Sequence, residues 1–171
     1  MDASVSATAL PEKLADLVLE IDHVAIAVAD LETAINWYSR GLGLSVVERR
    51  TTRGEHTGMT SAVLKAGRTI VVLIQGTEPD SQVSRFIEHF GPGVQHLAFA
   101  VRDLDAALAA LAAEGGGPET PIIEDVGIRQ AFLRRDPGSG VRIELIERNG
   151  GTFTDKSVEA LFRAFERQGL Y

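Results

Sequence analysis

Two histidines occupy matching places in two similar stretches of the sequence. The first stretch reads IDHVAIAVADLETAINWY and contains His23, and the second reads VQHLAFAVRDLDAALAAL and contains His96. Seven aligned positions, the histidines included, are identical, which shared composition does not explain. The histidines lie 73 positions apart, so the sequence contains a duplicated unit. Two copies related by a pseudo-twofold axis would direct both imidazoles at one centre.

A glutamate in the second copy completes a set of metal-binding side chains. Aligning the last strand-like segment of each copy, TIVVLIQ with VRIELIE, places Glu144 opposite Val72. Glu144 lies between two aliphatic residues in a segment that otherwise reads as buried, where an unpaired carboxylate would be costly. A lone strand histidine is more often a hydrogen-bonded core residue, but two at matching positions beside a carboxylate reverse that expectation. We predict that His23, His96 and Glu144 bind one divalent metal ion.

The composition of this set narrows the choice of metal and of chemistry. Two imidazoles and one carboxylate suit Fe(II), Mn(II), Co(II), Ni(II) or Zn(II). Because Val72 offers no donor, up to three coordination positions stay open, which is typical of non-haem Fe(II) oxygenases. A fourth protein ligand would instead favour Lewis-acid chemistry. Fe(II) is therefore the expected cofactor, while His56 and His89 fall outside the pattern and are expected at the surface.

Strand alternation predicts where the cavity lies. His23, Ala25 and Ala27 share one face of a strand, and the larger aliphatic residues between them share the other. The second copy repeats this division around His96. We expect the aliphatic face to pack against helices, and the histidine face to leave open volume above the sheet.

The elements that position these residues form two copies of one unit. Each copy begins with a strand and continues into a helix, for which Asp30 and Asp103 supply the N-cap. Strand-like segments follow at residues 44–50, 60–66 and 69–75 in the first copy and at 130–135 and 141–148 in the second. We predict an α+β fold of two tandem βαβββ modules, residues 21–76 and 94–148, joined by a segment with a short helix at 83–89. Together they form one domain, residues 21–148.

Two extensions flank this domain. Residues 1–20 form an N-terminal extension, with a helix expected over residues 8–19. Residues 149–171 form a C-terminal extension in which a helix is expected, because Val158, Leu161, Phe162 and Phe165 have helical spacing and Gly169 ends the stripe.

Composition excludes several functional classes. The chain has 171 residues and a net charge of −7, which disfavours nucleic acid and anionic membranes as partners. It contains no cysteine, so disulfides and thiol nucleophiles are excluded. No segment reads as a secretory signal or a membrane span. We expect a cytoplasmic protein with a small-molecule substrate, and a homodimer.

Residues 21–148 resemble the vicinal-oxygen-chelate superfamily, which includes glyoxalases, bleomycin-resistance proteins and dioxygenases. The closest local resemblance is to the C-terminal half of 4-hydroxyphenylpyruvate dioxygenase, carried by GPGVQHLAF, RQAFLRRDPGSGVRIELIER and VEALFRAFERQ. This resemblance implies a metal between paired βαβββ modules, Gln130 facing the substrate, and a terminal helix that caps the active site. The sequence departs from that family in lacking its N-terminal half and in carrying Ser157-Val158 where the family has Asn-Phe.

Methylmalonyl-CoA epimerase is the second family that the sequence resembles, through similar length and similar DHVAIAV and HLAF segments. That family has a glutamine ligand at the position of Val72 and a glutamate base near Ser61, and neither is present here.

Three functions follow from these observations. The first is an Fe(II)-dependent, dioxygenase-like enzyme that uses O2 on a small 2-oxo acid or similar chelating substrate, with Gln130 orienting that substrate. The second is a metal-dependent epimerase, isomerase or glyoxalase-type lyase using Co(II), Ni(II) or Zn(II), for which Glu55 or Glu124 would have to replace the missing base. The third is a metal-free protein that sequesters a metabolite or drug.

Overall fold

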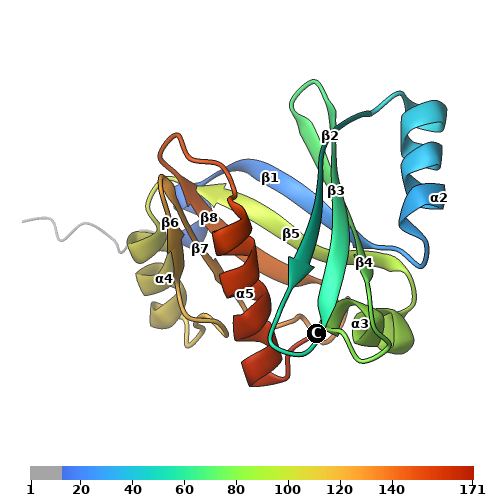
Figure 1. Cartoon of the computed structure of the whole chain (residues 1–171). Helices are drawn as coiled ribbons and strands as arrows, with labels where there is room; N and C mark the ends of the chain where they lie inside the picture. Colours follow the sequence, from blue (N-terminus) through green and yellow to red (C-terminus); the bar gives the residue numbers. More distant parts are fainter. Residues whose placement is uncertain (1–12) are drawn as a thin grey trace, which may run out of the picture.

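The computed structural model describes residues 13–171, which form two modules of the same element order (Figure 1). The first contains β1 (Val18–Ala27), α2 (Leu31–Asn36) with a π-helical continuation (Trp37–Gly41), β2 (Ser45–Arg53), β3 (Gly58–Ala66) and β4 (Thr69–Gly76). The second contains β5 (Gly93–Val101), α4 (Leu104–Ala113), β6 (Ile123–Asp125), β7 (Ile128–Phe132) and β8 (Arg142–Arg148). The predicted α+β fold of tandem βαβββ modules is thus confirmed.

The eight strands within residues 13–171 belong to one sheet of order β2-β3-β4-β1-β5-β8-β7-β6. The two modules meet at the centre, where β1 and β5 pair antiparallel. On either side the pairing is parallel, and the register places Val72 beside Ala25 and Glu144 beside Ala98. Since Ala25 and Ala98 are equivalent in the repeat, Val72 and Glu144 occupy equivalent positions of the sheet.

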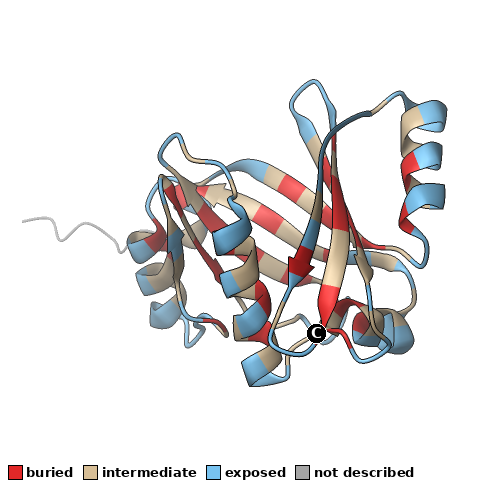
Figure 2. Ribbon diagram, viewed as in Figure 1, coloured by how far each residue is buried: buried red, intermediate tan, exposed pale blue. Residues whose placement is uncertain are grey.

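The helices of the two modules cover the outer face of the sheet. Leu31 and Ile35 of α2 pack with Ile26 and Val28 in one apolar cluster. Leu104 and Ala107 of α4 pack in a second cluster with residues of β5 and β8. As predicted, the larger aliphatic residues face the helices. Along β1 the buried residues are His23, Ala25 and Ala27 of the opposite face, whereas Val24 and Ile26 are half-buried, so buried and half-buried residues alternate (Figure 2).

Two further helices lie outside the repeated order. The linking helix α3 (Gln82–Phe90) packs on Ala27 and Ile74, close to the predicted range 83–89. The C-terminal helix α5 (Asp155–Gln168) lies across the inner side of the sheet, in contact with β2 and β6 (Figure 1). It begins at the N-cap Thr154 and ends at Gly169, whose positive φ of 63° favours glycine. The predicted C-terminal helix is therefore present.

The structure differs from the sequence-based prediction at two elements. Of the helix expected over residues 8–19, residues 8–12 lie outside the described range, and only α1 (Leu14–Leu17) is helical in the rest. Val18 already belongs to β1 because it pairs with Val101 at the end of β5. The sequence reading also missed β6, which supplies the third strand of the second module. None of the helices among residues 13–171 is long and apolar enough to cross a membrane.

Candidate metal centre

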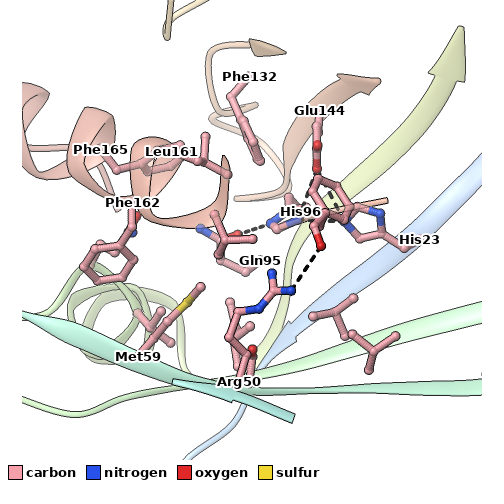
Figure 3. A pocket seen from close by; sticks show the side chains of 18 of the residues that line it. His23, Arg50, Met59, Gln95, His96, Phe132, Glu144, Leu161, Phe162 and Phe165 are labelled. Atoms are coloured by element: carbon pink, nitrogen blue, oxygen red, sulfur yellow. Dashed lines mark hydrogen bonds and ion pairs between the residues drawn. The ribbon is translucent and has the colours of Figure 1, made fainter. Parts of the chain in front are cut away.

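A cavity lies between the inner face of the sheet and α5 (Figure 3). Its volume is about 130 Å³, close to the roughly 150 Å³ of an apolar cavity that holds benzene. Most of its lining is apolar and comes from both modules and from α5, including Met59, Val63, Ile74, Phe132, Val158 and Phe162. This cavity suits a small ligand with an apolar body.

The three predicted ligands come together at one end of this cavity, from three adjacent strands (Figure 3). The Nε2 atoms of His23 and His96 lie 3.3 Å apart. Oε2 of Glu144 lies 3.4 Å from Nε2 of His23 and 3.5 Å from Nε2 of His96. All three ligand atoms lie within 4.8 Å of one another, so one ion could contact all of them.

The donor set fits a divalent cation. Glu144 is 1% exposed, and its Oε1 has no hydrogen-bond partner among residues 13–171, which is costly for a buried carboxylate. Nδ1 of His23 donates to Asp22 and Nδ1 of His96 donates to Gln95, so a neutral imidazole at either position would present the Nε2 lone pair to the centre. Two lone pairs and a carboxylate that converge in this way could hold a metal ion.

The two imidazoles differ in their protonation. Burial by itself lowers the pKa of His23, but hydrogen bonds and charges from Asp22 and Glu144 outweigh burial and raise that pKa to about 9. For His96, burial and then the positive charges of His23, Arg142 and Arg135 hold the pKa well below its usual value. Without a metal, the centre therefore holds one imidazolium and one neutral imidazole near neutral pH.

Val72 and Gln130 define the rest of the site. Val72 lines the cavity at the position equivalent to Glu144 and brings no donor atom. Gln130 of β7 also lines the cavity and is fully buried, and neither polar atom of its side chain has a hydrogen-bond partner in the described part of the chain. Because a buried unpaired amide costs about 1–3 kcal/mol, Gln130 is suited to bind a ligand that both donates and accepts hydrogen bonds.

The carboxylates considered for a catalytic base do not reach the cavity. Glu55 pairs with Arg167 and Glu124 pairs with Arg129 at the surface. Among the described residues, Glu48 of β2 is the carboxylate other than Glu144 that lines the cavity, and it pairs with Arg50.

The sequence reading missed some residues around the centre. It did not identify Glu48, although alternation along β2 places it on the same side as Arg50. It also missed Asp22 and Gln95, which hold the histidine rings.

The chain belongs to the Glyoxalase/Bleomycin resistance protein/Dioxygenase superfamily, whose sequence model matches residues 20–145. Among relatives, the uncharacterised protein YqjC of Bacillus subtilis (strain 168) is 30% identical over 136 residues, 76% of this chain and 93% of YqjC. Protein MelA of Shewanella colwelliana is 32% identical over 108 residues, which are 60% of this chain but only 31% of MelA.

Two solved structures are similar to different extents. A mutant 4-hydroxymandelate synthase from Streptomyces coelicolor has a TM-score of 0.77 at 24% identity, covering 90% of this chain and 55% of the synthase. Methylmalonyl-CoA epimerase from Mycobacterium tuberculosis has a TM-score of 0.64 at 34% identity, covering 77% of this chain and 89% of the epimerase. The first match shows a shared fold, and this chain spans just over half of that enzyme. Both kinds of enzyme had been expected from the sequence.

Proposed function

We propose that this protein is an Fe(II)-dependent, dioxygenase-like enzyme that acts on a small 2-oxo acid or a similar chelating substrate. The observation that carries the proposal is Val72 at the position equivalent to Glu144. His23, His96 and Glu144 would hold the iron, and Val72 would add no fourth protein ligand, which is the ligand set typical of non-haem Fe(II) oxygenases. The chemistry that iron supplies when bound is activation of O2 beside a chelated substrate.

The residues of the chain contribute binding and protection. Gln130 offers its unpaired amide to the polar end of the substrate. The apolar wall and α5 exclude water, which favours reactions of reactive oxygen species with the substrate rather than with solvent. The cavity volume favours a substrate whose body is about the size of one small ring.

The test is anaerobic purification and metal analysis, followed by O2-uptake measurements with a panel of 2-oxo acids. We expect about one iron per chain and O2 uptake with at least one acid that has an apolar side chain. A protein that retains no iron and consumes no O2 with any acid of the panel would contradict the proposal. Absence of any bound metal, together with tight binding of an organic ligand, would favour a sequestering protein.

The second candidate is a metal-dependent epimerase or lyase, because the identity to the epimerase of M. tuberculosis is 34% over most of that chain. This function needs a base beside an acidic C–H bond. Ser61 and Val72 line the cavity where that family would place its base and fourth ligand, and Glu48 is held by Arg50. Deuterium exchange into a thioester or hydroxy-acid substrate under anaerobic conditions, without O2 uptake, would favour it.

A further inference from the structure

Each histidine of the metal centre follows a β-bulge. In the β1–β5 ladder, Ile21 pairs with Phe99 and His23 with Ala98, so Asp22 is an extra residue. In the same ladder, His96 pairs with Ala25 and Val94 with Ile26, so Gln95 is the corresponding extra residue on β5. A bulge redirects a side chain that strict alternation would place on the opposite face.

The two bulge residues hold the two histidine rings in the same way. Oδ1 of Asp22 lies 2.8 Å from Nδ1 of His23, and Oε1 of Gln95 accepts from Nδ1 of His96. Both bulge residues are largely buried. The duplicated sequence therefore contains two matching pairs of a bulge residue and a histidine, and in each pair the bulge residue orients Nε2 of the histidine toward the centre.

The two bulge residues differ in charge. Asp22 accepts two hydrogen bonds from Arg148, one of them 2.8 Å long from Nη2 to Oδ1. The Asp22 carboxylate is thus paired with the guanidinium of Arg148. Gln95 carries no charge. A carboxylate on the outer nitrogen makes an imidazole a stronger metal ligand than a neutral amide does.

Arg148 also contacts the segment that leads into α5. Its Nη1 donates to the carbonyl of Gly151 over 3.2 Å, and its guanidinium lies 4.8 Å from the ring centroid of Phe153. Phe153 in turn makes an edge contact with His23, with ring centroids 5.8 Å apart. The guanidinium is thus held in place from two sides, which keeps Asp22 aimed at His23.

We infer that Asp22, fixed by Arg148, is a positioning residue that makes His23 the stronger of the two imidazole ligands, while Gln95 only orients His96. This inference rests on the metal site of the proposed function. It predicts that two residues at equivalent bulges contribute unequally to metal affinity.

The experiment is titration of the metal-free protein with Co(II), monitored by visible absorption and by competition with a chelator of known affinity. Asp22→Asn keeps the shape of the side chain and removes its charge. We expect Co(II) affinity to fall about 10–100-fold and the absorption bands of bound Co(II) to shift. Gln95→Ala should lower the affinity less, and Asp103→Asn, at the distant N-cap of α4, should leave affinity and spectrum unchanged.

Two outcomes would overturn the inference: wild-type affinity and spectrum in Asp22→Asn, or an equal loss in Gln95→Ala. If Asp22→Asn does not fold, Arg148→Lys decides, since it keeps Asp22 and a positive charge but loses the two-bond geometry. We expect it to weaken Co(II) binding several-fold and to shift the bands in the same direction; an unchanged titration overturns the inference.

Wild-type protein that binds no Co(II) overturns the inference and the proposed metal site together. Unequal effects in a protein without O2 uptake support the inference and contradict only the dioxygenase proposal.

Discussion

His23 and His96 share one centre but occupy opposite electrostatic surroundings. Asp22 and Glu144 favour the charged form of His23, whereas burial and neighbouring positive charges disfavour the charged form of His96. In the metal-free state, an imidazolium at His23 partly neutralises Glu144 at the place that a cation would occupy. Binding of a metal would therefore have to displace a proton from Nε2 of His23.

The raised pKa of His23 gives the metal-free protein a pH-dependent stability. The folded state binds an extra proton between pH 6.5 and about 9, so the free energy of unfolding should fall as pH rises through that window. The contribution is complete below pH 6.5, lost above about pH 9, and worth at most about 3 kcal/mol. Urea unfolding of metal-free protein across this range measures it. Asp22→Asn should flatten the decline, and an equally steep decline in that variant would contradict the contribution of Asp22 to the raised pKa of His23.

Val72 is the residue on which the choice of chemistry depends. Val72→Gln introduces an amide oxygen at the fourth equivalent position, which should occupy one of the open coordination positions. We expect metal to be retained and O2 uptake to fall at least about tenfold. Val72→Leu is the matched control, because it adds volume without a donor. If Val72→Gln consumes O2 as fast as the wild type while Val72→Leu does not, the open position is not what supports the reaction.

At the scale of elements, α5 is attached to the first module at both ends. The carboxylate of Glu166 accepts from the backbone N–H of Glu55 over 2.6 Å and from the backbone N–H and hydroxyl of Thr57 over 2.9 and 2.7 Å. At the other end, Nε of Arg50 lies 2.8 Å from Asp155. The hydrogen bonds of Glu166 join α5 to the turn between β2 and β3. The position of α5 over the cavity therefore depends on that turn.

Glu166→Ala should loosen α5 without unfolding the sheet. Removing three hydrogen bonds to a carboxylate costs on the order of 1–3 kcal/mol locally. We expect backbone amides of residues 155–168 to exchange with deuterium about 10–100-fold faster, while those of β1 and β5 keep their rates. Glu159→Ala is the control, since Glu159 forms an ion pair with Arg163 of the same helix, at 4.0 Å. Unchanged exchange in α5 would show that its apolar face alone holds it.

Local signals predicted most of the elements, and long-range pairing explains what they missed. The caps were correct, because Asp30 and Asp103 accept from the backbone amides of Thr33 and Ala106. β6 has only three residues with no apolar alternation, so it forms because β7 is beside it. The bulges could not be predicted, since alternation places Asp22 on the face opposite His23.

At the scale of the whole molecule, the internal duplication made the composition of the candidate site predictable, which no single motif did. The alignment of the two copies predicted that Val72 and Glu144 are equivalent. The register of the parallel strand pairs β1–β4 and β5–β8 places the two residues at equivalent positions of the sheet. The structure brings the three predicted ligands together, and their use as metal ligands stays a prediction. The partners of Nδ1 depend on the antiparallel β1–β5 register, which a sequence pattern does not encode.

Because the ligands come from both modules, metal binding should stabilise the whole fold. His23 belongs to the first module and His96 and Glu144 to the second, so the unfolded chain offers no preformed site. A metal at about 100 times its dissociation constant would add roughly 2.7 kcal/mol to the free energy of unfolding. For a chain of this size that corresponds to a rise in Tm of about 5–10 °C. Calorimetry with and without Co(II) measures the rise, which Glu144→Gln should largely abolish and Asp103→Asn should preserve. Equal Tm values for metal-free and metal-treated wild type would mean that the three side chains do not hold an ion between the modules.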